Sequence, residues 1–420
     1  MLPTYSLKSL PKDAILKYAS SKATRVSLKQ MFTLGSRLLE RKDPLALLIP
    51  TQFLHQELPI RLAQSVKMLN SHELPYEMCG LPTFRRITYE HLEDIGTLSQ
   101  IPKPKTAKQV DDFTDVMKYI QKRHTSRVLS VGQGLRELLQ ENNLKPCDLH
   151  AKKFQKFFDS FYTLNLGTRL LLGEHLNLHD RGRNLVRNIS PMTIAKRAID
   201  DARKVCANHF GREAPEVKIY SGLESINALY IEEHLHRILF EILKNSLRAT
   251  VEFHSSEQTL PPLKLIMADG GEDVSFKLSD QGGGIPLSAM PRLWSYVYSE
   301  PQGDDSVQIS GEVNDYVDRP LSGFGHGLPL ARLTARYFGG DLNVVSMEGY
   351  GTDTYLHLFR EDSCLENLPE IAHLNLQFER FVENLPFSLD LSASDHLSTP
   401  SLPSVPLSTY QEPAFTEATA

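Results

Sequence analysis

The spacing of the apolar residues changes near residue 190, and this change restricts the folds that the chain can adopt. Before that point apolar residues recur every three or four positions, as on one face of a helix. Further helices are predicted at 154–164 and at 52–69, the latter interrupted at Pro59. One series predicts a single long helix through Val110, Phe113, Met117, Ile120, Val128, Val131, Leu135 and Leu138.

After residue 190 the pattern mixes helices with strands. Val274, Phe276 and Leu278 alternate with polar residues, which predicts a half-buried strand ending at Asp280. Another strand is predicted at 342–347, after a helix that two glycines end. The chain is therefore expected to be an α+β protein of two domains, a four-helix bundle followed by an α/β layer domain.

Composition excludes several other classes of protein. The 420 residues suffice for two or three domains, and 46 Lys and Arg against 51 Asp and Glu give a net charge of −5. This charge gives no general attraction for nucleic acid. The four cysteines include no CxxC pair, so neither a disulfide framework nor a zinc knuckle is expected, and no apolar run is long enough to span a membrane.

The two ends of the chain differ from the rest. Residues 1–25 carry five Lys and Arg and one acid, which is typical of a mitochondrial transit segment and also of an ordinary basic arm. Residues 363–420 are expected to form a largely disordered tail, in which 371–382 could add one docked helix. The bundle is then assigned to 26–187 and the α/β domain to 188–362.

The first candidate motif lies on a helix predicted at 232–250. Glu241, Asn245 and Arg248 are spaced so that they align on one face. A carboxylate and an amide one turn apart could hold a reacting hydroxyl and a magnesium ion, which prefers oxygen ligands. A solvated helix face explains the same stripe.

Three glycine-rich motifs follow. Asp280 precedes Gly282 and Gly284 at the end of a strand, where glycines allow close approach of a flat ligand and the carboxylate can accept from an exocyclic amine such as that of adenine. The run Gly323, Phe324, Gly325, His326, Gly327 opens a helix at Leu328, an arrangement that favours phosphate binding. In the run 349–353, Thr352 could offer its hydroxyl near Asp280, although a hairpin turn accounts for this run equally well. A plain turn is also an alternative for the run after Asp280, but its three consecutive glycines exceed what a turn requires.

In order and spacing, these motifs resemble the N, G1, G2 and G3 boxes of the GHKL ATPase superfamily. The resemblance implies an α/β sandwich that binds Mg-ATP, with Asn245 as magnesium ligand and a mobile lid between Ile285 and Gly323. The residues expected to contact the nucleotide are Asn245, Arg248, Asp280, Gly282, Gly284, Gly323, Phe324, Gly325, His326, Gly327, Leu328 and Thr352.

Within that superfamily, residues 26–360 resemble the mitochondrial pyruvate dehydrogenase kinase family. The runs FLHQELPIRLA, LPPLKL, RLWSYVYS and SMEGYGTD carry this resemblance, together with Glu241–Asn245. It implies a serine kinase that inactivates the E1 α subunit of pyruvate dehydrogenase in the mitochondrial matrix. It also implies a homodimer that binds the lipoyl domain of the E2 component, near Met31, Phe32 and Leu34, residues that could equally belong to the core.

The resemblance also implies catalytic roles. Glu241 would be the general base, His124 would orient it through a hydrogen bond, and Lys244 would assist electrostatically. Taken alone, His124 is more typical of a core histidine, because it continues the apolar register of Ile120 and Val128.

Other readings stay open. A branched-chain 2-oxoacid dehydrogenase kinase is the nearest, and the chain lacks the Asp-Trp pair that many pyruvate enzymes carry near the C-terminus, because its one tryptophan is Trp294. A two-component histidine kinase is more distant, since His124 is not followed by the usual acid and proline. An ATP-driven machine of the chaperone or mismatch-repair type usually places the ATPase domain first.

Overall fold

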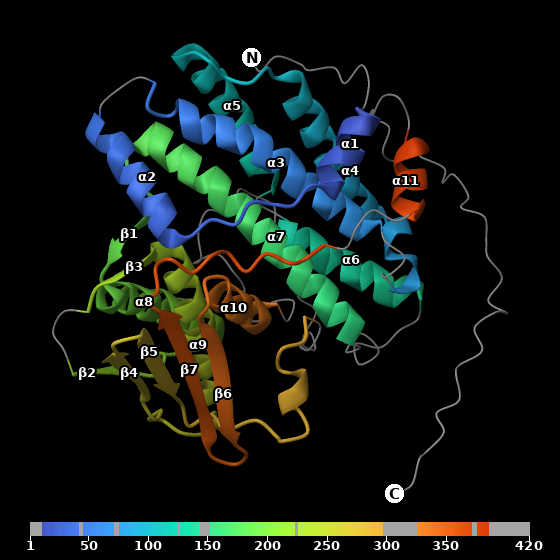
Figure 1. Cartoon of the computed structure of the whole chain (residues 1–420). Coiled ribbons are helices and arrows are strands. Elements are labelled where there is room, and N and C mark those ends of the chain that lie inside the picture. Colours follow the sequence, from blue (N-terminus) through green and yellow to red (C-terminus); the bar gives the residue numbers. More distant parts are fainter. Residues whose placement is uncertain are drawn as a thin grey trace, which may run out of the picture.

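The computed structural model describes residues 11–41, 45–70, 75–124, 127–142, 152–222, 226–296, 326–371 and 376–385. It shows a helical half above an α/β half (Figure 1). The predicted two-domain α+β architecture is confirmed.

The bundle is built around α3, α4, α7 and the successive helices α5 and α6. The predicted single helix over 110–138 stays a prediction, because residues 125 and 126 between α5 and α6 lie outside the described residues. Their neighbours in the helical half are α1 and α2 and the short turns η1 and η3. The bounds are α1 Lys12–Ser20, α2 Leu28–Arg41, α3 Leu48–Leu69, η1 Pro75–Gly80, α4 Pro82–Gln100, α5 Ala107–His124, α6 Arg127–Glu141, α7 Lys152–Leu176 and η3 Asn177–Arg181.

Pro59 does not interrupt α3, contrary to the prediction from sequence. A proline inside a helix costs about 3 kcal/mol, since it removes one hydrogen bond and crowds the preceding turn. Leu58, Leu62 and Ala63 on either side of it are at most 1% exposed. Burial of such side chains contributes roughly 1.5–3 kcal/mol each, which is enough to keep the helix continuous.

Both ends of the chain contribute a helix to the bundle. Ile15 and Ala19 of α1 share a core with Phe378 and Val382 of α11 (Leu376–Glu383). The helix predicted near 371–382 is therefore confirmed. The rest of the predicted largely disordered tail, residues 386–420, lies outside the described residues.

The α/β half contains a five-stranded sheet of order β2-β4-β5-β7-β6, in which only the β2–β4 pair is parallel, and a separate β1–β3 pair. Helices α8, α9 and α10 cover one face of the larger sheet (Figure 1), where alternate strand residues such as Phe276 are buried. The bounds are β1 Val186–Ile189, α8 Pro191–Phe210, β2 Val217–Ser221, β3 Ala228–Ile231, α9 Glu232–Phe253, β4 Leu263–Asp269, β5 Asp273–Ser279, η4 Met290–Arg292, α10 Gly327–Arg336, β6 Asp341–Met347 and β7 Gly351–Phe359.

The two halves share a core. Leu28 and Met31 of α2 and Leu170 of α7 belong to the same buried cluster as the α/β domain. Met31 is thus a core residue, Phe32 is partly buried against that core and Leu34 is 40% exposed. The halves are therefore fixed against each other by apolar contacts.

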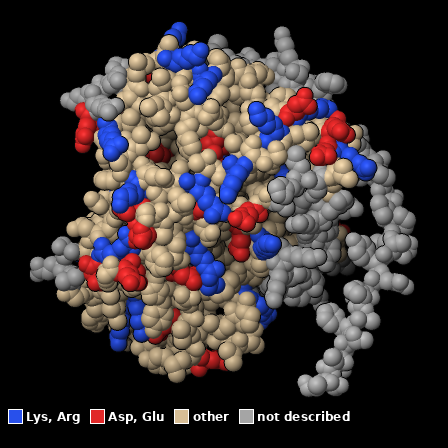
Figure 2. Space-filling model, in the orientation of Figure 1, with Lys and Arg blue, Asp and Glu red and all other residues tan. Residues whose placement is uncertain are grey.

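Charges of both signs occur on one side of the molecule (Figure 2). On the side shown in Figure 2, Lys and Arg alternate with Asp and Glu. Among the helices that the structure describes, none combines the length and apolar character needed to cross a bilayer.

Candidate active site

Glu241 and Lys244 lie on the buried side of α9, each 5% exposed. The Lys244 Nζ is 2.8 Å from Glu241 Oε2. A buried carboxylate is costly unless it is paired, so this ammonium group favours the ionised form of Glu241. The pair provides a carboxylate that can accept a proton at neutral pH.

The start of α10 lies directly against this carboxylate. A Cβ built on Gly327 would be 2.3 Å from Glu241 Oε2. A larger residue here would displace the Glu241 carboxylate, so α9 and α10 approach one another closely at this point. The N–H groups of the first turn of a helix have no partner within the helix, and its dipole favours an anion. A buried carboxylate and the N-terminal end of a helix therefore meet at one place.

Asn245 and Arg248 occupy the exposed side of the same helix. Asn245 is exposed between the buried Lys244 and Ser246, which leaves its amide oxygen accessible to a metal ion. Arg248 forms a hydrogen bond from Nε to Glu252 Oε1 at 2.6 Å. Asn245 and Arg248 of the predicted stripe thus share the more exposed side of α9, whereas Glu241 is buried, and Arg248 has an acidic partner on its own helix.

Asp280 lies at the end of β5 and is 6% exposed. Its Oδ1 accepts from the Gly282 N–H at 3.0 Å and from the Thr352 N–H at 3.1 Å. Burial raises the pKa of Asp280, although hydrogen bonds from Ser246 and these two amides favour its charged form. The structure thus brings together Asp280 and Thr352, as predicted from their motifs.

Thr352 contacts Asp280 in a way that differs from the prediction. Its backbone donates to Asp280, whereas its Oγ1 is 2.9 Å from Ser346 Oγ. Sequence reasoning missed both serines, Ser246 and Ser346. The sequence pattern could have identified Ser246, because it lies four residues after Ile242 on the apolar face of α9, where it is buried.

The glycines of the Asp280 loop are required by its tight contacts. Gly284 has φ +71°, and a Cβ there would be 2.0 Å from the Met347 carbonyl oxygen. A Cβ on Gly282 would be 2.6 Å from the Cβ of Ala249. The loop is thus held between α9 and the β6–β7 hairpin, with one edge facing the side where Asn245 lies.

The third motif is only partly within the described residues. Gly323, Phe324 and Gly325 lie outside them, as does the expected lid from 297 onward. Leu328 packs against the α/β core. The His326 ring is buried, with its centroid 5.9 Å from that of Tyr162 and 5.8 Å from that of Tyr296. The His326 side chain therefore joins α10 to the bundle instead of facing the Asp280 loop.

His124 does not pair with Glu241, and this prediction is wrong. Its Nε2 is 2.8 Å from Asp94 Oδ2 inside the bundle, and its ring centroid is 5.3 Å from that of His91. Burial and the nearby charges of Arg127, Arg123 and Arg169 lower the pKa of His124 well below its ordinary value, so the imidazole is neutral. His124 is therefore a core histidine at the end of α5, hydrogen-bonded to Asp94 of α4.

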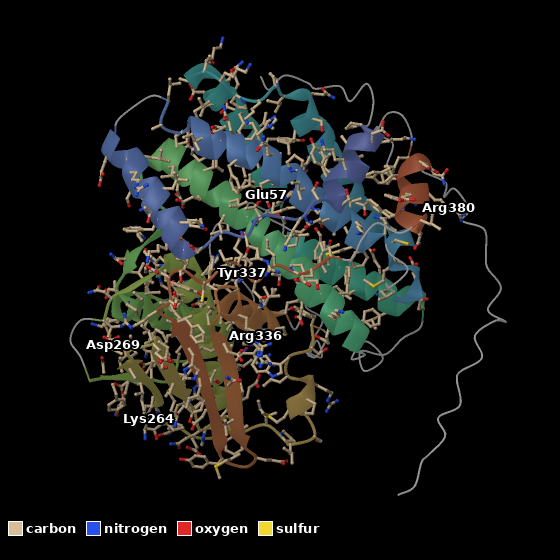
Figure 3. The ribbon with its side chains drawn as sticks, in the orientation of Figure 1. Glu57, Lys264, Asp269, Arg336, Tyr337 and Arg380 are labelled. Carbon is tan, nitrogen blue, oxygen red and sulfur yellow. The ribbon has the colours of Figure 1, made fainter. Side chains whose placement is uncertain are left out.

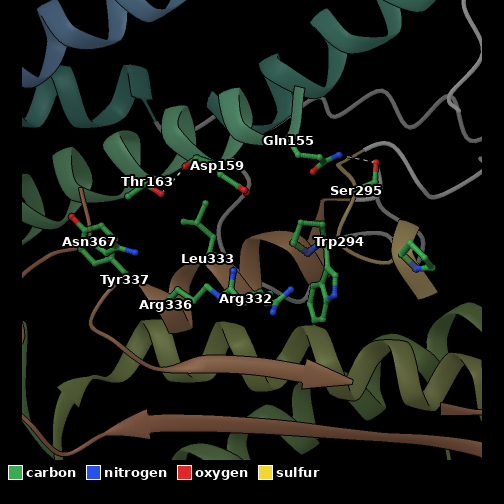
Figure 4. A pocket seen from close by; sticks show the side chains of 12 residues that line it. Gln155, Asp159, Thr163, Trp294, Ser295, Arg332, Leu333, Arg336, Tyr337 and Asn367 are labelled. Carbon is green, nitrogen blue, oxygen red and sulfur yellow. Dashed lines mark hydrogen bonds between the residues drawn. The ribbon is translucent and has the colours of Figure 1, made fainter. Parts of the chain in front are cut away.

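A pocket of about 290 Å³ lies beside this site, between α7 and the outer face of α10 (Figure 4). Asp159 and Thr163 line it from α7, and Arg332 and Arg336 from α10. Trp294 stacks its ring on the Arg332 guanidinium at 4.2 Å. The pocket is separate from the Asp280 loop and marks incomplete packing between the bundle and α10.

Comparison with known proteins agrees with this geometry. Residues 25–202 match a family described as mitochondrial branched-chain alpha-ketoacid dehydrogenase kinase, and residues 230–362 match the histidine kinase-, DNA gyrase B- and HSP90-like ATPase family. The second match contains Glu241, Asp280, Gly327 and Thr352.

Individual relatives match over both halves. A mitochondrial [pyruvate dehydrogenase (acetyl-transferring)] kinase of Arabidopsis thaliana is 39% identical over 86% of this chain and 97% of its own. The human mitochondrial [pyruvate dehydrogenase (acetyl-transferring)] kinase isozyme 4 is 31% identical over 82% of this chain and 83% of its own. The mitochondrial kinase of the same name from Schizosaccharomyces pombe is 40% identical over 59% of each chain. The shared ATPase domain, the preceding helical bundle and these identities show that the chain belongs to the mitochondrial pyruvate dehydrogenase kinase family.

Proposed function

We propose that this chain transfers the γ-phosphoryl group of Mg-ATP to a serine of the E1 α subunit of pyruvate dehydrogenase. The observation that carries the proposal is the buried Glu241–Lys244 pair against the start of α10. The names of the relatives support the choice of substrate and a mitochondrial location, with the matrix as the compartment where the complex would be met.

In this mechanism Glu241 accepts the proton of the serine hydroxyl as the oxygen bonds to the γ-phosphorus and the bond to the β-phosphate oxygen breaks. General-base assistance of this kind contributes roughly 10²–10⁴-fold. Lys244 keeps the carboxylate ionised, and the first-turn amides of α10 stabilise the charge of the transferred group. Asp280 would accept a hydrogen bond from the adenine amine.

The residues present fit a magnesium ion. Asn245 offers an exposed amide oxygen one turn from Glu241, and ATP phosphates and water can supply the remaining oxygen ligands. No group of three or more His, Cys, Asp or Glu able to hold a metal occurs in the described part of the chain. Bound Mg²⁺ would neutralise charge on the phosphates.

Two features of the assembly also belong to this proposal. The outer face of the large sheet exposes several large apolar side chains, each between 41% and 67% exposed: Tyr220, Ile266, Val345, Met347 and Phe359. We infer that a second copy of the chain covers this face in a homodimer. The exposed apolar residues near the end of α2, Leu34 and Leu39, are a candidate contact for the lipoyl domain of the E2 component.

The decisive experiment compares Glu241→Gln and Asn245→Ala with the wild-type chain. Purified pyruvate and branched-chain E1 proteins are incubated in parallel with Mg-ATP. We expect Glu241→Gln to bind Mg-ATP but to transfer phosphate at least about 100-fold more slowly. Asn245→Ala should lose affinity for Mg-ATP. Glu233→Gln, a change at an exposed acid in the first turn of the same helix, is the matched control and should behave as wild type.

The outcome also separates the alternatives. Stable phosphoserine on pyruvate E1 supports the proposal, whereas preferential labelling of branched-chain E1 supports the second candidate, which the family match over residues 25–202 favours. Acid-labile phosphate on this chain itself would indicate a histidine kinase. Label on neither E1 protein would refute the substrate assignment.

A further inference from the structure

A fully buried ion cluster joins the bundle to the end of the α/β half. Arg61 of α3 is 0% exposed, and so is Glu366, which follows β7. The two side chains form a bidentate pair, with Nη1 3.0 Å from Oε1 and Nη2 2.7 Å from Oε2. Arg61 Nε also donates to Glu57 Oε1 at 3.0 Å. Such two-pronged charged hydrogen bonds fix orientation as well as distance.

The segment before α2 completes this arrangement. Val26 N–H donates to Glu366 Oε2 at 3.0 Å, and Glu366 N–H donates to the Val26 carbonyl at 2.9 Å. Thr24 N–H donates to Glu57 Oε1 at 2.9 Å, and its carbonyl accepts from Arg61 Nη2 at 2.8 Å. The buried charges therefore have partners from three separate segments.

Tyr337 connects this network to α10. It follows the last residue of that helix, is 1% exposed and donates its hydroxyl to Glu366 Oε1 at 2.5 Å. Burial and the Glu366 charge raise the pKa of Tyr337 well above its ordinary value, so the hydroxyl stays protonated. We name Glu57, Arg61, Tyr337 and Glu366 the Arg61 cluster. Figure 3 shows Glu57 and Tyr337 at the boundary between the two halves.

Helix α7 passes so close to the cluster that only glycine fits. A Cβ on Gly167 would be 2.3 Å from Tyr337 Oη and 2.5 Å from Arg61 Nη1. Further along α7, the pocket lined by Asp159 and Thr163 separates this helix from the outer face of α10 (Figure 4). The C-terminal end of α10 is thus tightly held at the Arg61 cluster, whereas part of its length faces a cavity.

The opposite end of α10 begins at Gly327, against the Glu241 carboxylate. A helix of ten residues is a rigid rod about 15 Å long. A shift or rotation at Tyr337 therefore moves Gly327 and the first-turn amides relative to Glu241. Such movements matter, since a displacement of about 1 Å can slow a reaction about 100-fold.

We propose that Arg61, Tyr337 and Glu366 are positioning residues for phosphoryl transfer, which act by fixing α10 between the bundle and α9. The inference rests on the proposed function, because it takes Glu241 and the start of α10 as the reacting centre. The cluster touches neither nucleotide nor serine in this mechanism. It sets the distance between the base and the phosphate-binding helix terminus.

Two variants test the proposal without relying on a drastic change of fold. Tyr337→Phe removes one hydroxyl and leaves the Arg61–Glu366 pair intact. Arg61→Met combined with Glu366→Met and Glu57→Gln removes all three charges of the cluster, so that no buried carboxylate is left without its cation, a replacement that buried ion clusters often tolerate in stability. Tyr119→Phe is the control, because this tyrosine lies on α5, is 45% exposed and does not belong to the Arg61 cluster.

For each full-length variant we would measure thermal unfolding, the Kd for Mg-ATP, and kcat and KM for phosphorylation of E1. We expect Tyr337→Phe to unfold near the wild-type temperature, with kcat lower by about 10-fold or more and KM for E1 little changed. The triple variant should show the same loss of kcat, and Tyr119→Phe none. A merely structural role would lower the unfolding temperature and leave the kcat of the folded enzyme unchanged.

The two proposals fail in distinguishable ways. If wild type is active and both variants keep wild-type kcat, the positioning role is overturned and the proposed function stands. If wild type labels neither E1 protein, the proposed function fails. In that case the Kd for Mg-ATP tests the role of the Arg61 cluster, because α10 would still hold the phosphates. A Kd raised about 10-fold in Tyr337→Phe would support the positioning role of the cluster. An unchanged Kd would overturn it.

Discussion

At the scale of single residues, a substitution at Gly327 should lower activity without lowering the stability of the fold. Its contact is with the far end of a glutamate side chain, which can move at little cost in folding. We expect Gly327→Ala to keep the wild-type unfolding temperature while displacing the Glu241 carboxylate and lowering kcat by about 10–100-fold.

The matched control is Gly271→Ala, because a Cβ there meets no atom within 4 Å. This variant should transfer phosphate at the wild-type rate. Equal activity of both alanine variants would contradict the assigned contact between α10 and the base.

Glu174, near the end of α7, predicts a pH dependence of stability. Its Oε2 accepts from the Leu185 N–H at 2.9 Å, and burial raises the pKa of Glu174 to about 7. The folded state then binds a proton that the unfolded state has lost, so stability falls as pH rises from about 4.5 to 7.

Glu174→Gln removes this titration and keeps an oxygen acceptor. Relative to wild type, we expect the variant to gain up to about 3 kcal/mol of stability between pH 5 and pH 8, measured by thermal unfolding. Glu213→Gln, at a side chain that is 92% exposed, should show no such change. A gain that is the same at both pH values would rule out Glu174 as the titrating group.

At the scale of elements, sequence periodicity performed well where one face of a segment is buried. The strand at β5 and the helices α9 and α10 were predicted close to their observed bounds, whereas the helix predicted at 154–164 is shorter than α7, which runs from Lys152 to Leu176. Periodicity does not show whether one apolar stripe belongs to an unbroken helix, and residues 125 and 126 between α5 and α6 lie outside the described residues. It failed at Pro59 because local propensity does not include the burial of the flanking residues.

The docking of α11 can be tested directly. Phe378 is 0% exposed and belongs to the bundle core, so Phe378→Ala should destabilise the protein by about 3–5 kcal/mol. Leu376→Ala, at a residue 73% exposed on the same helix, should have little effect on the unfolding temperature. Equal effects of the two changes would argue against the observed packing of α11 on α1.

At the scale of the whole molecule, the uncovered sheet face predicts the assembly. Ile266 lies on the inner strand β4 and is 41% exposed, so a second copy seated there would bury it. We expect sedimentation to give twice the chain mass of 47.4 kDa for wild type and a shift toward monomer for Ile266→Asp.

Leu287→Asp provides the comparison, because this leucine is 84% exposed in a loop after β5 and away from the sheet face. Its mass should equal that of wild type. A dimer that survives Ile266→Asp and dissociates with Leu287→Asp would place the interface elsewhere.

The sequence by itself determined the helices at α9 and α10 and the strand at β5, and it predicted that Glu241, Asn245, Asp280 and Thr352 belong to one site. These are features of local spacing and motif order, which the chain carries in one dimension. Only the tertiary structure decided that His124 pairs with Asp94, and that Arg61 meets Glu366 from 305 positions away. A buried charge takes whichever partner the fold brings within hydrogen-bond distance, and that choice depends on contacts that no local pattern encodes.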